Sequence, residues 1–177
     1  QDEVLSYPCV GEDHPGLRYF RSVRTTGRNE STVVALFSAK LLNTGTSYMK
    51  MWMPASSDVS YFTALAPSAK TASSPYQSKP SLVVTMRKEK PAVEEPFVVV
   101  YEPISDKLST GLIESVDRIK LDSLGKKGCA IKVKTKEGDT FTLVNILKDG
   151  PVILNNQKCC GDFAIFAKRK GKNSVYV

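Results

Sequence analysis

The stretch Phe-Val-Val-Val-Tyr-Glu-Pro, residues 97–103, decides the fold of this chain. Four apolar residues run without interruption into Tyr-Glu-Pro, and prolines stand at both ends, Pro96 and Pro103. A short β-branched and aromatic run bounded by prolines is typical of a buried strand rather than a helix. We therefore predict a buried strand over residues 97–103.

Strand patterns recur on both sides of this stretch. Residues 48–53 alternate three methionines with Tyr48, Lys50 and Trp52, which is the two-residue period of a strand with two different faces. Further strands are predicted over residues 33–41, 82–86, 113–121, 163–167 and 174–177.

A β-hairpin is predicted near the middle of the last third of the chain. Residues 130–136 alternate apolar and polar side chains, Glu-Gly-Asp follows at 137–139, and residues 140–144 form the returning strand. Residues 168–172 predict a basic turn before the closing strand. Many short strands separated by turns predict an all-β fold, an antiparallel β-sandwich of the supersandwich kind with little helix.

Length and composition favour one domain. The chain has 177 residues, of which 41% are hydrophobic, enough for one β-sandwich domain over residues 1–177 with its own core. No apolar run approaches the roughly 20 residues that span a bilayer. Residues 1–3 are polar and acidic, which leaves two interpretations open: a start just after a removed signal peptide, or a fragment or accessory domain cut from a larger protein.

Positive charge gathers at one end of the sequence. Residues 1–119 carry 13 Lys and Arg against 13 Asp and Glu, whereas residues 120–177 carry 12 against 5, so the last third accounts for the whole net charge of +7. An acidic glycan, a nucleic acid, a membrane surface or an acidic sister domain fits this asymmetry, and so does solubility alone.

Three lysines make the densest basic pattern. Lys132, Lys134 and Lys136 share one face of a predicted strand, so they form a positive stripe. The stripe predicts contact with a polyanion, or alternatively protection of an exposed sheet face or edge.

The aromatic and cationic side chains of residues 48–53 form a second candidate site. Tyr48, Lys50 and Trp52 share one strand face, and aromatic rings beside a cation make a platform on which sugar rings stack. The alternative is that Trp52 fills the core.

The sequence contains few residue patterns that indicate catalysis or metal binding. The four cysteines show no Cys-x-x-Cys spacing and the single histidine cannot complete a zinc site, so we predict no metal and no cofactor. His14 is followed by Pro-Gly, which favours an exposed structural histidine over a general base. If the chain is an enzyme, His14, Tyr7 and Arg18 are the catalytic candidates.

Four runs resemble the C-terminal β-domain of heparinase II/III-like polysaccharide lyases. They are Met-Trp-Met-Pro at 51–54, the 97–103 stretch, Ser-Val-Asp-Arg-Ile at 115–119 and Gly-Asp-Phe-Ala at 161–164. The resemblance implies an antiparallel β-domain that packs against a helical toroid, in bacterial enzymes that cleave uronic-acid polysaccharides by β-elimination. The family's catalytic residues and histidine metal site match no position of this chain.

The resemblance favours an accessory, non-catalytic role in binding or processing an acidic glycan, with the glycan or a missing helical toroid as partner, in the periplasm or outside the cell. One alternative is an active polysaccharide lyase. Another is a basic β-barrel that binds nucleic acid, which is disfavoured because the strands lack the aromatic stripe of single-strand binders.

Overall fold

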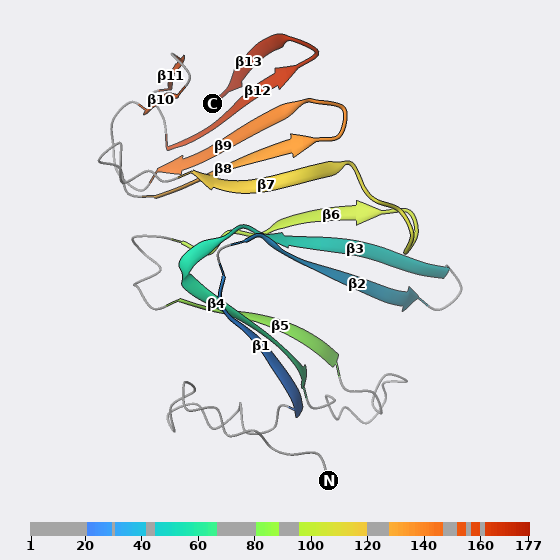
Figure 1. Cartoon of the computed structure of the whole chain (residues 1–177). Coiled ribbons are helices and arrows are strands. Elements are labelled where there is room, and N and C mark those ends of the chain that lie inside the picture. The colour runs from blue at the N-terminus through green and yellow to red at the C-terminus, as the bar shows by residue number, and fades with distance from the viewer. Residues whose placement is uncertain are drawn as a thin grey trace. The chain divides into compact units, whose positions relative to one another are not determined.

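The computed structural model describes residues 21–29, 31–41, 45–66, 81–88, 96–119, 128–146, 152–154, 157–159 and 162–177. These residues form strands, turns and bends, and none of them lies in a helix. Within the same residues, no helix is long and apolar enough to cross a membrane. The prediction of an all-β, antiparallel sandwich with little helix is confirmed (Figure 1).

A five-stranded antiparallel sheet holds the basic end of the chain. Its order is β13-β12-β9-β8-β7. The strands are β7 (Ile113–Ile119), β8 (Gly128–Thr135), β9 (Thr140–Ile146), β12 (Phe163–Arg169) and β13 (Lys172–Tyr176). The predicted β8–β9 hairpin is confirmed, because the alternation of apolar and lysine residues sets one face of β8 inward.

A three-stranded antiparallel sheet precedes it, in the order β2-β3-β6. Its strands are β2 (Val33–Leu41), β3 (Gly45–Met53) and β6 (Val100–Ile104). The remaining strands are β1 (Arg21–Asn29), β4 (Ser56–Ala66) and β5 (Ser81–Lys88), ordered β1-β4-β5, and the pair β10 (Val152–Leu154) and β11 (Gln157–Cys159).

The chain divides into two compact units. The first comprises Gln1–Asn29 and Asp58–Lys88, and the second comprises Glu30–Ser57 and Glu89–Val177. The single domain over residues 1–177 therefore stays a prediction. The second unit contains both the five-stranded sheet and the β2-β3-β6 sheet.

The core of the second unit joins its two sheets. Val116, Ile131 and Val133 on the five-stranded sheet are buried, and the Trp52 ring of β3 packs against them. Val98 and Val100 pack against the same cluster, as do Ile113, Phe141 and Leu143. The Thr32 hydroxyl also donates a hydrogen bond of 2.8 Å to the Val116 carbonyl. Apolar side chains thus hold the two sheets together, and hydrogen bonds such as this one support the apolar contact.

The prediction of a buried strand over residues 97–103 is confirmed only in part, since the strand covers Val100–Ile104 and is only partly buried. Phe97 is 45% exposed and precedes the strand, which begins at Val100, and Tyr101 is 59% exposed. The buried member is Glu102, at 6% exposure. Proline is tolerated inside this strand because β6 lies at the edge of its sheet among the described strands, where one row of backbone groups makes no ladder bonds.

Candidate functional site

The catalytic candidates Tyr7, His14 and Arg18 lie outside the described residues, so their role stays a prediction. Among the residues that are described, no group of three or more His, Cys, Asp or Glu side chains is placed to hold a metal ion. The described part of the site is therefore built from lysines, aromatic rings and two buried carboxylates.

Glu102 is the first of these carboxylates, and the Trp52 ring lies against it. The Trp52 indole Nε1 donates a hydrogen bond of 2.9 Å to Glu102 Oε2. The other carboxylate oxygen accepts hydrogen bonds from the backbone N–H groups of Leu112 and Ile113. All three donors are neutral, so the buried charge is satisfied by hydrogen bonds rather than by an ion pair.

Gly111 allows this close approach of loop and carboxylate. Its φ is +74°, and a Cβ atom at this position would collide with the Glu102 carboxylate. A glycine is therefore required both by the backbone conformation and by the space left beside Glu102.

Two lysines that the sequence marks as binding candidates hold the same loop. The ammonium groups of Lys50 and Lys136 both donate to the carbonyl of Thr110, and Lys136 also donates to the Gly111 carbonyl at 2.8 Å. The structure thus brings together one member of each predicted site. Both ammonium groups donate to backbone carbonyls of the chain itself, and the Trp52 indole donates to the Glu102 side chain.

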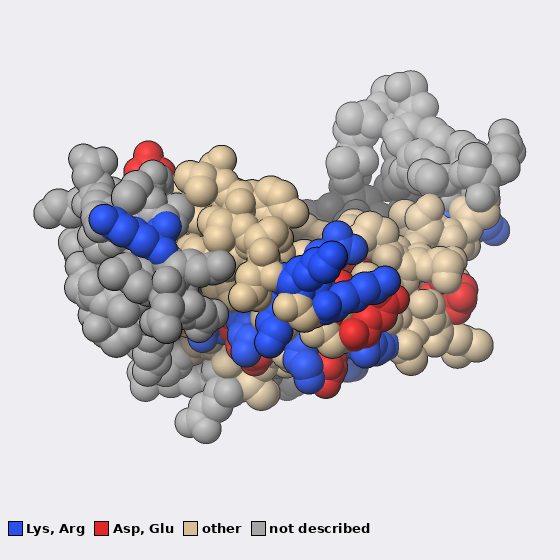
Figure 2. All heavy atoms as spheres, turned by 90° about the horizontal axis from the view of Figure 1, so that it is seen from above, with Lys and Arg blue, Asp and Glu red and all other residues tan. Residues whose placement is uncertain are grey.

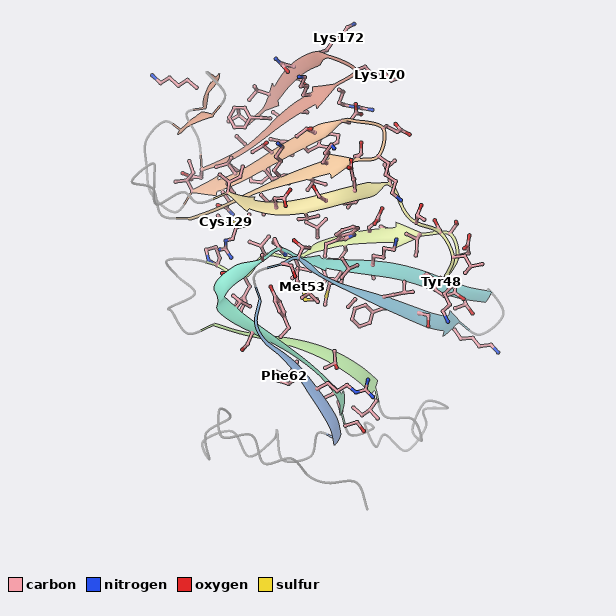
Figure 3. The ribbon with its side chains drawn as sticks, in the orientation of Figure 1. Tyr48, Met53, Phe62, Cys129, Lys170 and Lys172 are labelled. Atoms are coloured by element: carbon pink, nitrogen blue, oxygen red, sulfur yellow. The ribbon has the colours of Figure 1, made fainter. Side chains whose placement is uncertain are left out.

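The remaining predicted binding residues, Tyr48, Lys132 and Lys134, are partly or fully exposed. Tyr48 is half-buried on β3, opposite Ile104 of β6 (Figure 3). Lys134 forms an ion pair of 2.9 Å with Glu114, and both side chains are close to half exposed, at 46% and 47%. Lys132 is exposed and stands opposite Asp117 in the register. Exposed pairs of this kind contribute roughly 0–1 kcal/mol.

A second buried carboxylate, Asp139, holds the basic turn between β12 and β13. Its Oδ1 accepts the Lys170 N–H at 3.1 Å, and its Oδ2 accepts the Arg169 Nε–H at 3.3 Å. Both Lys170 and Gly171 have positive φ, at 47° and 79°, the conformation of a type I′ hairpin turn. The sequence predicts this turn, but the contact of Asp139 across 31 positions leaves no sequence signal.

The β12–β13 turn and its flanking positions carry three exposed lysines. Lys168, Lys170 and Lys172 are exposed, and no side-chain partner for them is found in the part of the chain that the structure describes. Figure 3 shows Lys170 and Lys172 projecting outward from the β12–β13 turn.

The sheet register brings the two basic segments together. Lys134 stands opposite Thr140, and Thr140 stands opposite Lys168, so both lysines lie on one face of the sheet with a single strand between them. Strands lie about 4.8 Å apart, which puts the two Cα atoms roughly 10 Å from one another. Figure 2, which views the molecule from above, shows Lys and Arg side chains gathered together, with Asp and Glu side chains beside them.

Cys129 adds no nucleophile to this surface. Its thiol is free and half-buried. Burial raises the pKa of the Cys129 thiol above its ordinary value, and the positive charge of Arg118 opposes part of that rise. The thiolate, which is the reactive form, is therefore scarce at neutral pH.

Comparison with known proteins relates part of the chain to a polysaccharide lyase. The chain is 36% identical over 89 residues to an endo-acting ulvan lyase from Formosa agariphila, a match that covers 50% of this chain and 10% of the lyase. The chain thus spans about a tenth of the length of this curated relative. No protein-family model matches the chain. No solved structure matches it either.

Proposed function

We propose that this chain is an accessory, non-catalytic β-sandwich domain of a heparinase II/III-like polysaccharide lyase, and that it binds an acidic polysaccharide such as ulvan. The observation that carries the proposal is the 36% identity to an endo-acting ulvan lyase over half of the chain. A place in the periplasm or outside the cell is part of this proposal and follows from the resemblance to heparinase II/III-like lyases.

Charge supports the acidic polysaccharide as ligand. Three exposed lysines of the β12–β13 turn, Lys168, Lys170 and Lys172, have no side-chain partner among the described residues. Lys132 and Lys134 lie on the face that Lys168 shares. A polymer with repeated carboxylate or sulfate groups meets several of these lysines at once. Such contacts weaken steeply with salt, since exposed charges are screened over about 8–10 Å at ordinary ionic strength.

An active polysaccharide lyase is the second candidate, because the relative is itself named a lyase. In that case the chain cleaves a uronic-acid glycan by β-elimination, with Tyr7, His14 and Arg18 as first candidates for the chemistry. The two functions differ in a direct readout, since β-elimination releases unsaturated uronate products that absorb in the near ultraviolet.

The test is affinity electrophoresis of the purified chain in gels containing ulvan, with a neutral polysaccharide gel as reference, at increasing salt. We expect retardation by ulvan alone. The triple variant Lys168→Ser, Lys170→Ser, Lys172→Ser is expected to lose about tenfold in affinity. The matched triple variant Lys132→Ser, Lys134→Ser, Lys136→Ser is expected to lose less, because Lys134 and Lys136 already have partners.

Three outcomes contradict the proposal. Equal mobility in the ulvan and neutral gels shows that the chain does not bind the acidic polysaccharide. Stronger retardation by single-stranded DNA than by ulvan favours the nucleic-acid alternative. A steady rise in near-ultraviolet absorbance when the chain is incubated with ulvan shows that it is an enzyme and not an accessory domain.

A further inference from the structure

Two exposed aromatic rings lie on one face of the β12–β13 hairpin. Tyr176 is 58% exposed and Phe163 is 48% exposed. Ile165 stands directly opposite Tyr176 in the register, and Phe163 lies two positions before Ile165 on the same strand. Because side chains alternate along a strand, all three point to the same face of the sheet.

This face is the same one that forms the core nearer β7. Tyr176, Ile165, Leu143 and Ile131 stand opposite one another on four successive strands, and Ile131 is buried in the cluster that the Trp52 ring covers. The apolar row thus begins in the core and ends on two strands where its rings are open to solvent. A contiguous exposed apolar surface with polar groups around it is one signature of a ligand-binding surface.

Polar groups border the rings on the same face. Ser174 and Lys172 lie two and four positions before Tyr176 on β13, so they share its side of the strand. Lys172 is exposed, and the described residues offer it no side-chain partner. From Tyr176 to Lys172 the strand extends roughly 13 Å, more than one sugar ring. Asn145, also exposed, stands opposite Phe163.

We infer that Tyr176 and Phe163 form a stacking platform for sugar rings of an acidic polysaccharide, with Ser174 and Asn145 as hydrogen-bonding neighbours and Lys172 as the partner of a carboxylate or sulfate. The inference rests on the proposed function and assigns its binding surface. Diagonal neighbours on paired strands have Cα atoms roughly 7–8 Å apart, within reach of aromatic side chains, so both rings can serve one ligand. The apolar face of a sugar ring replaces water on the rings, while the lysine supplies charge complementarity.

The platform differs from the lysine clusters in how it responds to salt. Contacts of the lysines with an anionic polymer fade as salt rises, whereas stacking on rings does not depend on charge. The rings should therefore account for the binding that remains at high salt.

The experiment measures affinity of the full chain for ulvan oligosaccharides by calorimetry, at low and at high salt. Tyr176→Ala and Phe163→Ala are each expected to weaken binding about fivefold at low salt and to remove the residual binding at high salt. Tyr176→Phe keeps the ring and is expected to bind like the wild type. Tyr101→Ala is the matched control, because Tyr101 is 59% exposed but lies on β6 in the other sheet.

The outcomes separate this inference from the proposed function. If the wild type binds ulvan oligosaccharides and the two ring variants bind equally well, the platform is wrong and the accessory role stands. If the ring variants and Tyr101→Ala lose the same affinity, the rings act only through the fold and the platform is again wrong. If the wild type binds no acidic oligosaccharide, the proposed function fails and this inference fails with it.

Discussion

Two buried carboxylates fix two turns of this protein in different ways. Glu102 is 6% exposed and accepts hydrogen bonds from three neutral donors, which anchor the loop before β7. Asp139 is 7% exposed and accepts one backbone N–H and the guanidinium of Arg169, a side chain that is 65% exposed. The two carboxylates are thus equally buried, but Glu102 accepts only from neutral groups, whereas Asp139 accepts from a charged side chain that lies at the surface.

The lysines near Glu102 and Asp139 also differ in their contacts with the rest of the chain. Near Glu102, Lys50 and Lys136 donate to backbone carbonyls of the loop. Near Asp139, Lys168, Lys170 and Lys172 are exposed without side-chain partners among the described residues. Lysines that look alike in the sequence therefore differ in the structure: Lys50 and Lys136 bind backbone carbonyls, whereas Lys168, Lys170 and Lys172 are exposed.

The largest expected effect comes from removing each carboxylate. Glu102→Ala should lower the free energy of unfolding by about 4 kcal/mol, because three part-buried donors lose their acceptor. Asp139→Ala should lower it by about 2 kcal/mol, since the exposed Arg169 side chain reaches water and a single turn N–H loses its acceptor. Urea denaturation followed by circular dichroism measures both. Equal losses of unfolding free energy in the two variants would contradict the proposed difference between Glu102, which accepts from three neutral donors, and Asp139, which accepts from the exposed Arg169.

The second effect separates backbone strain from the crowding at Glu102. Gly111 and Gly138 both have positive φ, at +74° and +85°, but only at Gly111 would a Cβ meet the carboxylate, while Gly138 faces open space. Gly138→Ala should cost about 1 kcal/mol and Gly111→Ala about 3 kcal/mol. Thermal unfolding of the two variants checks this.

The Glu102→Ala background supplies the control for that comparison. With the carboxylate removed, Gly111→Ala should cost only about 1 kcal/mol more, because the two changes share one contact. A full additive loss in the double variant would show that the Glu102 side chain is not what the alanine meets.

The smallest effect distinguishes the lysines themselves. Lys136→Met should cost about 1 kcal/mol, because two loop carbonyls lose a charged donor, whereas Lys134→Met should cost about 0.3 kcal/mol, since it removes only an exposed pair with Glu114. Chemical denaturation in low and high salt is the measurement. The small Lys134 effect should disappear in high salt. A larger effect for Lys134 than for Lys136 would contradict the conclusion that Lys136 stabilises the fold more than Lys134 does.

Strand positions were predictable where hydrophobic alternation was clear or where turn-forming residues bounded an apolar run. Residues 33–41 form β2, and the hairpin over residues 130–144 forms β8 and β9. The prediction for residues 97–103 was accurate only in part. The apolar run has no alternation, so nothing in it indicates which side chain points inward. The strand starts three residues later than predicted, at Val100, and buries Glu102 rather than a valine.

The candidate site was predictable only in part. The lysine stripe and the aromatic residues of β3 were recognised from their two-residue spacing, but their partners were not, because Thr110 lies 60 positions from Lys50 and 26 from Lys136. The proximity of Phe163 and Tyr176 could not be predicted from the sequence. It depends on the β12–β13 register, which pairs Tyr176 with Ile165, two positions after Phe163.

By itself the sequence determined the all-β class, the turns and the concentration of positive charge in the last third, because these follow from local periodicity, turn-forming residues and composition. Only the tertiary structure decided which lysines hold backbone and which face solvent, why position 111 is a glycine, and which aromatic rings remain uncovered. These outcomes depend on strand order and register, which pair residues far apart in the chain and which no local pattern encodes.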